Sequence, residues 1–378
     1  MAETVERAAG DGTGAGELVF GIFDWVDADG GPLGQLYERR LRMLEYADRA
    51  GYWGYHVAEH HGTPLGMAPS PSVFLAAAAQ RTRRLRLGPM VYVLPLYNPM
   101  RLAEEIVMLD HLSGGRLELG IGRGSVAWEL DMLAVDAAEI KGRYDEGLAV
   151  ILAALTTGEV TFEGHYYQFR GATLPAGPVQ RPYPPLWYPT SNPATVPWLA
   201  EQGYNTLFSF NTPTLEETRR RLDLYRAHRG KAAHNPHRVN PHVAVPKYGM
   251  ARKVYVAETD AEAHRVAAAA LDRFRHNFTY LHERHGVHTF TERLGDFAAC
   301  LERGTLFAGA PATVAARISA FLAGTGGNYF AGCFAWGDLT DEQVLRSLHL
   351  FTTAVIPAVR AQLAAITPAP QIAARAGD

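Results

Sequence analysis

The segment Ala58-Glu59-His60-His61 places one carboxylate and two imidazoles at the end of a short apolar run, 53–57. An imidazole changes charge near neutral pH, so a histidine at the end of a strand could take up or release a proton during a reaction. A hydrogen-bonded cluster that only stabilises the fold is a second interpretation. A metal site is the third and least favoured, because neighbouring residues of one strand point to opposite faces and do not easily share an ion.

Two further segments have features suited to an anion. Residues 120–125 surround Arg123 with glycines, which let the backbone approach a ligand, and a guanidinium can hold a phosphate through two parallel hydrogen bonds. Residues 190–195 supply hydroxyl groups and, at Asn192, the expected start of a helix, whose N-terminus favours negative charge. A tight turn or a helix cap would explain either segment alone, but together they predict one phosphate site. Arg143 is poorly placed for the dipole of its own helix and is expected to serve the same anion.

These segments follow β-rich apolar runs that alternate with amphipathic helical stretches from residue 18 onwards, which is typical of βαβ units around a parallel sheet. Eight strands are expected, at 18–23, 53–57, 85–94, 116–121, 186–188, 205–210, 253–256 and 329–334. They predict an α/β fold, a single (β/α)8 TIM barrel with insertions, whose active site lies at the carboxyl ends of the strands. An open doubly wound sheet is the competing architecture, but no Gly-x-Gly-x-x-Gly follows the first run.

The barrel is expected to extend over residues 17–365, between a disordered leader, 1–16, and a flexible tail, 366–378. An insertion hairpin is predicted at about 159–170, with Glu163-Gly164 at its turn. Residues 285–308 show no regular pattern and are a candidate lid over the site.

Composition limits the classes of partner and compartment. The chain has 378 residues, 47% of them hydrophobic, and its 36 lysines and arginines do not outnumber its 39 acids, so nucleic acid is not an expected partner. Cys300 and Cys333 are too few for a disulfide framework, which favours a cytoplasmic location. No stretch approaches the roughly 20 apolar residues needed to cross a bilayer, so no membrane partner is expected.

At these residues the sequence resembles the bacterial luciferase-like flavin monooxygenase family, and the resemblance runs over nearly the whole chain. The motifs that carry it are Glu59-His60-His61, Leu87-Gly88, Val93-Leu94-Pro95, Asn98-Pro99-Met100-Arg101, Glu104-Glu105, Leu109-Asp110, Ser113-Gly114-Gly115-Arg116, Gly120-Ile121-Gly122-Arg123-Gly124, the segment 178–187, Leu350-Phe351 and Pro357. No single motif is specific to the family, but the ordered series is.

The resemblance implies roles for particular residues. His60 matches the active-site histidine of the family, and Met90-Val91 matches the place of a non-proline cis peptide behind the flavin ring. The expected FMN-binding residues are Met90, Arg123, Ser125, Arg143, Ser191, Asn192, Thr195 and Phe210. The expected substrate pocket contains Glu59, His61, Tyr97 and Trp336. Light emission is not expected, because Gly122 and Ser191 stand where light-emitting luciferases have cysteine and glutamate.

The implied activity is that of a monooxygenase in which reduced FMN and dioxygen form a flavin hydroperoxide that oxidises a small organic substrate. An apolar rim of Phe23, Trp25, Tyr97 and Trp336 would keep water out, and His60 would handle the proton. Because the chain has no dinucleotide fingerprint, a separate reductase is expected to supply the reduced flavin, and the resemblance also implies a homodimer. Two alternatives stay open: a deazaflavin-dependent hydride transferase, and a non-catalytic flavin-binding protein, against which the intact His60 argues.

Overall fold

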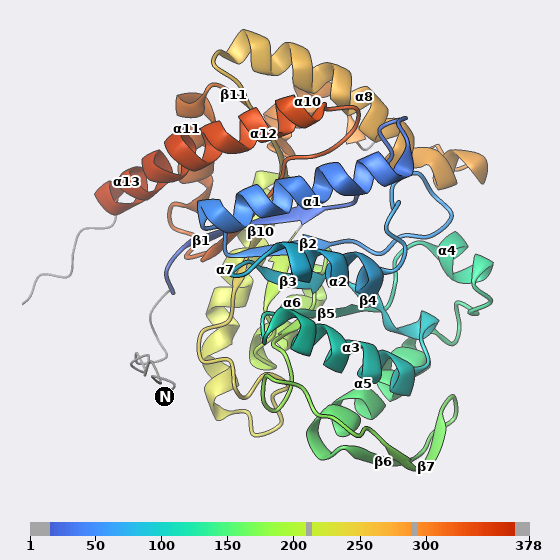
Figure 1. Cartoon of the computed structure of the whole chain (residues 1–378). Helices are drawn as coiled ribbons and strands as arrows, with labels where there is room; N and C mark the ends of the chain where they lie inside the picture. Colours follow the sequence, from blue (N-terminus) through green and yellow to red (C-terminus); the bar gives the residue numbers. More distant parts are fainter. Residues whose placement is uncertain (1–15, 209–213, 289–293, 367–378) are drawn as a thin grey trace, which may run out of the picture.

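The computed structural model of the chain describes residues 16–208, 214–288 and 294–366. Strands lie at the centre and helices surround them, as Figure 1 shows. The strands are β1 (Val19–Asp24), β2 (Gly54–Val57), β3 (Arg86–Pro89), β4 (Tyr92–Val93), β5 (Leu119–Gly122), β6 (Glu159–Glu163), β7 (Gln168–Thr173), β8 (Leu186–Trp187), β9 (Thr206–Phe208), β10 (Tyr248–Val256), β11 (Leu306–Gly309) and β12 (Tyr329–Cys333).

The helices are α1 (Leu33–Ala50), α2 (Pro71–Arg81), α3 (Pro99–Ser113), α4 (Ala127–Met132), α5 (Ile140–Thr157), α6 (Val196–Glu201), α7 (Leu215–Arg229), α8 (Asp260–Arg284), α10 (Phe297–Arg303), α11 (Pro311–Leu322), α12 (Asp341–Leu350) and α13 (Ile356–Ile366). Shorter helical turns are η1 (Leu94–Leu96), η2 (Pro193–Thr195), η3 (Gly230–His234) and η4 (Phe351–Val355).

Parallel strands form two sheets at the centre of the molecule. The larger sheet has seven strands, in the order β11-β10-β12-β1-β2-β3 with β9 also beside β10, and it curls into a half-barrel. The smaller sheet has the order β4-β5-β8. Single bridges, between Leu87 and Leu117 and between Trp187 and Asn205, join the two sheets. The predicted α/β fold of parallel strands and outer helices is confirmed, although continuous ladders cover only part of the barrel circuit.

Three stretches differ from the predicted strands. The run 85–94 is divided into β3 and β4 at Met90-Val91, where the peptide bond is cis, at the position that the family resemblance implies. β10 begins at Tyr248, five positions before the expected start at Lys253. The prediction that 285–308 is irregular is wrong in its second half, which contains α10 and most of β11, and β11 pairs in parallel with β10. All four residues of β11 are buried, so it lacks the alternation of polar and apolar side chains that marks many strands in a sequence.

Local sequence explains where several helices begin. The side chain of Asn98 accepts hydrogen bonds from two backbone N–H groups of α3, and Pro99 occupies the first position of that helix. Thr340 and Gln343 form the predicted reciprocal capping box at the start of α12. These caps satisfy backbone groups at the ends of barrel helices and so fix where the preceding loops end.

The interior of the barrel is packed with aromatic rings. The imidazole of His56 lies 4.7 Å from the ring of Trp187 and 5.7 Å from that of Tyr329, measured between centroids. Burial, with a smaller effect from the charge of Arg86, lowers the pKa of His56 to about 3. A Cβ at Gly21 would lie 1.9 Å from the Tyr329 hydroxyl oxygen, so glycine is required there. This packed layer leaves the carboxyl ends of the strands as the place for a ligand.

An antiparallel hairpin of β6 and β7 occupies the place of the predicted insertion at 159–170 and lies next to α5 (Figure 1). It pairs with neither of the parallel sheets. The hairpin therefore adds to the outside of the barrel without changing the order of its strands.

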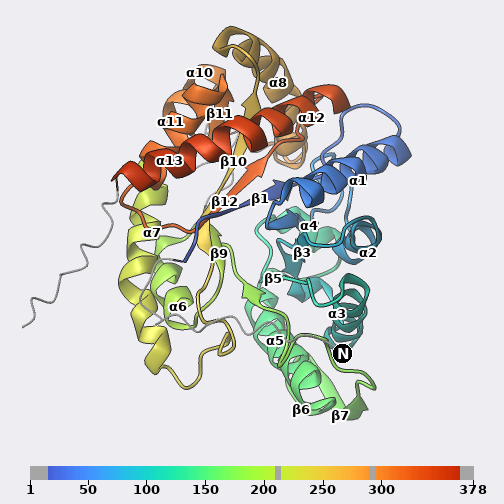
Figure 2. The same ribbon diagram turned by 60° about the vertical axis from the view of Figure 1, so that its left-hand side comes forward.

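The last helices form one helical run, Asp341–Ile366, which Figure 2 shows as α12 and α13 beside α11. By length and composition alone this run is long and apolar enough to cross a membrane, so the chain contains a longer apolar stretch than its sequence led us to expect. A mostly buried core helix of a soluble protein passes the same test, but only 17% of the apolar window of this run is buried. The buried side chains of this run include Val344, Leu348 and Phe351.

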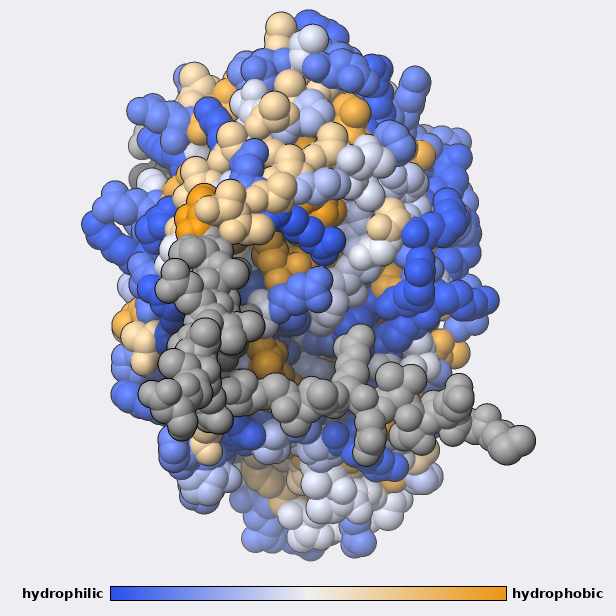
Figure 3. All heavy atoms as spheres, turned by 90° about the vertical axis from the view of Figure 1, so that its left-hand side faces the viewer, coloured by the Kyte–Doolittle hydropathy of each residue, from blue (hydrophilic) through white to orange (hydrophobic). Residues whose placement is uncertain are grey.

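Figure 3 shows the side of the molecule that carries α13, where hydrophobic side chains gather in the upper half.

Candidate active site

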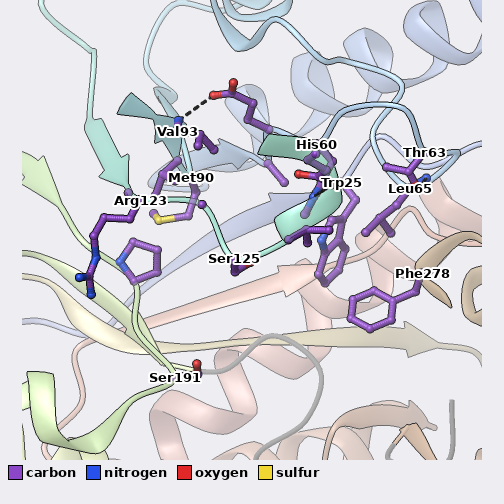
Figure 4. A pocket seen from close by; sticks show the side chains of 18 of the residues that line it. Trp25, His60, Thr63, Leu65, Met90, Val93, Arg123, Ser125, Ser191 and Phe278 are labelled. Carbon is purple, nitrogen blue, oxygen red and sulfur yellow. Dashed lines mark hydrogen bonds and ion pairs between the residues drawn. The ribbon is translucent and has the colours of Figure 1, made fainter. Parts of the chain in front are cut away.

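The described residues surround a cavity of about 620 Å³ at the carboxyl ends of the strands. Sites for small molecules and cofactors have volumes of roughly 300–1,000 Å³. The cavity is lined by Phe23, Trp25, Ala58, Glu59, His60, Thr63, Leu65, Met90, Val91, Val93, residues 122–126, Glu129, residues 188–192, Phe278, Leu281 and His282. Figure 4 shows Arg123 and Trp25 on opposite sides, with Ser125 between them. The cavity therefore has a polar end near Arg123 and an apolar end near Trp25.

Arg123 follows β5 in the predicted glycine-rich loop. Its Nε donates a hydrogen bond to the Tyr188 hydroxyl oxygen at 3.2 Å, which links the ends of β5 and β8. Gly122 packs closely against Val91, the residue before β4: a Cβ at Gly122 would lie 2.5 Å from Cγ2 of Val91. Gly124 has a φ of 82°, a conformation that favours glycine. The glycines thus allow the close turn from which Arg123 lines the cavity.

The loop after β8 forms the neighbouring wall of the polar end. Ser191 and Asn192 line the cavity, as predicted. The side-chain oxygen of Asn192 accepts a hydrogen bond from the Ala194 N–H at 3.0 Å and caps the turn η2. The ordinary capping interpretation therefore holds for the Asn192 oxygen, whereas its amide nitrogen does not take part in the cap and the hydroxyl of Ser191 lies in the same wall.

A buried arginine lies behind the same loop. Arg221 of α7 donates Nη2 to the backbone oxygen of Ser191 at 2.8 Å. The residue is 9% exposed, and its Nε and Nη1 have no hydrogen-bond partner within the described ranges. A guanidinium buried with few partners is unfavourable, and an anion nearby would offset part of that cost. Nothing in the sequence marks Arg221, since it is one of several arginines in a polar helix.

His60 lines the cavity, and its Nδ1 lies 2.8 Å from Oε1 of Glu129. Glu129 comes from the first turn of α4, the short helix that follows the Arg123 loop. The sequence predicts His60 at this place but contains no signal for Glu129, because the contact joins residues 69 positions apart.

A second histidine, His282 of α8, also lines the cavity. Burial lowers the pKa of His282, and the nearby charge of Glu129 acts in the opposite direction.

His61 pairs with the buried carboxyl group of Glu59. Its Nε2 lies 2.9 Å from Oε1 of Glu59, while Oε2 of Glu59 accepts from the Val93 N–H at 2.9 Å. Burial raises the pKa of Glu59, although these hydrogen bonds act against the rise. Burial alone would lower the pKa of His61, but the hydrogen bond and charge of Glu59 outweigh it and raise the pKa. Glu59 lines the cavity as predicted, whereas His61 is not among the lining residues.

Four more predicted residues do not line the cavity. Trp336 is 1% exposed, and its Nε1 donates to the Val254 oxygen at 3.4 Å, so it belongs to the core. Tyr97 packs against another tyrosine, Tyr92, at 5.5 Å between ring centroids. Trp336 is a core residue and Tyr97 is partly buried beside the core, so neither contributes to the cavity wall.

Arg143 and Thr195 complete this group. The Nε of Arg143 donates to Oε2 of Glu139 at 2.8 Å, and its guanidinium lies over the ring of Tyr166. Thr195 ends the turn η2, beyond the part of the loop that lines the cavity. Phe210, the remaining predicted residue, lies outside the described residues.

Aromatic side chains build the apolar end. The rings of Phe23 and Trp25 meet edge to face at 4.5 Å, and Trp25 contacts Phe274 of α8 at 5.2 Å. The Nζ of the buried Lys253 lies 3.9 Å from the centroid of Phe274. Val26, directly after Trp25, has a φ of 53°, a strained conformation for a β-branched residue. The Val26 N–H donates to Oδ1 of Asp24 at 2.7 Å, and the turn that this bond closes carries Trp25 in the wall of the cavity.

Within residues 16–208, 214–288 and 294–366, no group of three or more histidine, cysteine, aspartate or glutamate side chains is placed to hold a metal ion. Both cysteines, Cys300 and Cys333, are buried and unpaired. The polar side chains that line the cavity are one guanidinium, two imidazoles, two carboxyl groups, one amide and several hydroxyls: Arg123, His60, His282, Glu59, Glu129, Asn192, Thr63, Ser125, Tyr188, Thr190 and Ser191.

Comparison with known proteins identifies the family. The sequence profile described as luciferase-like monooxygenase matches residues 18–329. The chain belongs to this family. One relative of the chain is the 4-hydroxyprotoasukamycin monooxygenase of Streptomyces nodosus subsp. asukaensis, which is 30% identical over 87% of the chain and 88% of that protein. Another is the oxygenase component of the trigonelline monooxygenase of Acinetobacter baylyi, which is 29% identical over 65% of the chain and 66% of that protein. A monooxygenase structure from Streptomyces bottropensis has a TM-score of 0.78 at 27% identity and covers 90% of the chain and 99% of that structure.

Two other structures share the luciferase-like fold at lower identity. The oxygenating constituent of 3,6-diketocamphane monooxygenase from Pseudomonas putida, in complex with FMN, has a TM-score of 0.73 at 21% identity over 90% of the chain and 98% of that structure. A coenzyme F420-dependent reductase from Methanopyrus kandleri has a TM-score of 0.63 at 19% identity, and the match covers 90% of the chain and 99% of that structure. Enzymes with either cofactor therefore share this fold.

Proposed function

We propose that the chain is the oxygenase of a flavin-dependent monooxygenase system that uses reduced FMN and dioxygen to oxidise a small organic substrate. One observation carries the proposal: a single cavity joins a polar end at Arg123 and Ser191 to an aromatic end at Trp25, with His60 in its wall. A phosphate and an organic ring system require ends of these two kinds in one continuous site. The monooxygenase names of the relatives support the same class of reaction.

The residues of the polar end fit the phosphate of FMN. Arg123, Ser125 and Ser191 would hold it, and Arg221 would add positive charge from behind the loop. Met90 also lines the cavity and is our candidate for contact with the flavin ring. When bound, reduced FMN supplies the electrons with which dioxygen is activated.

The chain itself contributes a dry, oriented site and control of a proton. Phe23, Trp25 and Leu65 would exclude water from the apolar end and contact an organic substrate through hydrophobic surface. His60 would take up or release the proton that the oxidation of the substrate requires. Because the lining of this end is mostly apolar, we propose a substrate that has few hydrogen-bonding groups.

A deazaflavin-dependent hydride transferase is the second candidate. A coenzyme F420-dependent reductase shares the fold, and a guanidinium at the polar end would suit the phosphate of either cofactor. The two functions differ in their need for oxygen, and the third possibility, a non-catalytic flavin-binding protein, would use neither oxygen nor a substrate.

The test combines the purified chain, chemically reduced FMN and isotopically labelled dioxygen with a panel of apolar ketones, aldehydes, phenols and alkenes. We expect mass spectrometry to find a product with one labelled oxygen atom only when protein, reduced FMN and oxygen are all present. Turnover of the panel by a reduced deazaflavin without oxygen would support the hydride transferase instead. Flavin binding with no product from either cofactor would assign the chain to the non-catalytic class.

We further propose a homodimer in the cytoplasm. Val73 of α2 and Met108 and Leu112 of α3 are 73%, 61% and 45% exposed, and these two helices pack side by side, so a second copy of the chain would cover them. Light scattering should then give twice the mass of one chain.

The cytoplasmic location is supported by the two cysteines, which are buried and form no disulfide, as is usual in a reducing compartment.

A further inference from the structure

The two adjacent histidines of the site use opposite ring nitrogens. Nδ1 of His60 lies 2.8 Å from the carboxylate of Glu129, whereas His61 directs Nε2 to the carboxylate of Glu59 at 2.9 Å. A neutral imidazole carries its single proton on one nitrogen, and the hydrogen bond made by one nitrogen decides the state of the other. The neutral forms of His60 and His61 should therefore be different tautomers.

The position of His60 is determined on several sides. Glu129 is buried, its side chain being 8% exposed, so its carboxylate is held close to the imidazole with little competition from water. A Cβ at Gly66 would lie 2.5 Å from Cβ of His60, which shows that the loop after β2 folds tightly against the histidine. The Nε2 of His60 has no hydrogen bond within the described part of the chain, and the residue lines the cavity.

An ionised carboxylate has no proton to donate, so the Nδ1 of His60 must be the donor in this pair. Nε2 is then left with its lone pair and can accept a proton from a group in the cavity. The imidazolium that results keeps its Nδ1–H hydrogen bond to Glu129, whose negative charge stabilises the positive ring. The same carboxylate lies near His282, and it favours the charged form of that ring as well.

We propose that Glu129 is a positioning residue that holds His60 as the Nδ1–H tautomer, so that Nε2 acts as the proton acceptor of the reaction. The role of Nε2 as the proton acceptor in catalysis rests on the proposed function. The tautomer of His60 does not, because it is a property of the protein without ligand. Glu129 follows Arg123 by six positions, in the segment that leads from the phosphate loop into α4. One short segment would thus both hold the anion of the cofactor and orient the proton acceptor.

The test is nitrogen NMR of the full chain with labelled histidine, recorded without flavin in mildly alkaline buffer. The signals of His60 are identified by their loss in His60→Gln. We expect a protonated Nδ1 and an unprotonated Nε2 at His60 in the wild type. Glu129→Leu should replace this pattern by a mixture of tautomers, while His61 keeps its own tautomer, which Glu59 selects. Glu104→Leu, at an exposed site on α3, is the matched control and should leave both patterns unchanged.

A wild-type spectrum with the proton of His60 on Nε2 would overturn the proposal, and it does so even if Glu129→Leu fails to fold. A pure Nδ1–H pattern that persists in folded Glu129→Leu would also overturn it, since another group would then select the tautomer.

Once a substrate is found, Glu129→Leu should lower kcat by roughly 10-fold to 100-fold with little change in KM. This loss is smaller than the loss of rate expected when the base itself is removed. Glu129→Gln should recover part of that loss, because its amide oxygen can still accept from Nδ1.

Discussion

The Nη2 of Arg221 donates a hydrogen bond to the backbone oxygen of Ser191 at 2.8 Å, so a buried cation lies directly behind the loop that forms the polar end of the cavity. Two of its other nitrogen atoms have no partner among the described residues. Replacing Arg221 by methionine should weaken FMN binding by about 3-fold to 10-fold, since about 1 kcal/mol of charge attraction would be lost. Riboflavin, which has no phosphate, should bind equally to both proteins.

Stability provides the control for the Arg221→Met variant. Apolar replacement of a buried charge with few partners is often neutral or stabilising, so we expect the Tm of the variant to be equal to or above that of the wild type. An equal loss of FMN and riboflavin affinity would show that Arg221 only shapes the loop and does not act on the phosphate.

Arg123 is the exposed guanidinium at the same end of the cavity. We expect Arg123→Ala to weaken FMN binding by about tenfold or more, because a hydrogen bond to a charged group contributes about 1.5–3 kcal/mol. Fluorescence titration measures the affinity. Arg101→Ala, which removes a surface arginine whose side chain is 79% exposed, should leave it unchanged. An unaltered affinity in Arg123→Ala would mean that the phosphate binds elsewhere.

His60 should matter for turnover and not for cofactor affinity. His60→Ala is expected to lower the rate by roughly 100-fold or more, the usual effect of losing a positioned acid or base, with FMN affinity nearly intact. His61→Ala should lower the rate less and stability more, because His61 pairs with the buried Glu59 and does not itself line the cavity. Wild-type turnover in His60→Ala on the true substrate would leave only a structural role for this residue.

His56 should make the fold sensitive to acid. Its pKa is about 3 in the folded chain, and the ordinary value is 6.5, so below that value the unfolded chain takes up a proton that the folded chain does not. The neutral imidazole therefore contributes its full stability above pH 6.5, the ordinary pKa of histidine. This stability is lost as the pH falls from 6.5 toward about 3, the pKa of His56 in the folded chain. At about pH 5 the loss should be about 2 kcal/mol.

Urea unfolding of the wild type and His56→Phe, at about pH 5 and pH 7.5, measures this effect. We expect the free energy of unfolding to fall less between these pH values in the variant, whatever its absolute stability. Parallel losses in the two proteins would show that His56 does not control the acid sensitivity.

The source of electrons is the last point to test. The sequence has no glycine fingerprint for a nicotinamide dinucleotide, and one relative is named as an oxygenase component. With FMN in air, the chain alone should oxidise NADH or NADPH no faster than free flavin does, and an added flavin reductase should start turnover. Rapid, substrate-dependent loss of nicotinamide absorbance without reductase would contradict the two-component arrangement.

Local sequence determined the features of this protein that depend on neighbouring residues. The apolar runs, the caps at Asn98 and Thr340, and the strand ends at His60 and Arg123 were all predictable, because strand periodicity, turn chemistry and helix capping act over a few positions. Since parallel strands end on one edge, those residues had to meet once a barrel was assumed.

Only the tertiary structure decided which residues complete the site. Glu129 and Arg221 lie on helices, where the face that meets the cavity depends on how each helix packs and not on its own pattern. Trp336 matches the composition of a rim, yet it packs in the interior, because an apolar side chain gains from burial at any depth of the barrel. The sequence thus specifies the strand ends that carry the chemistry, and packing selects the partners that hold them.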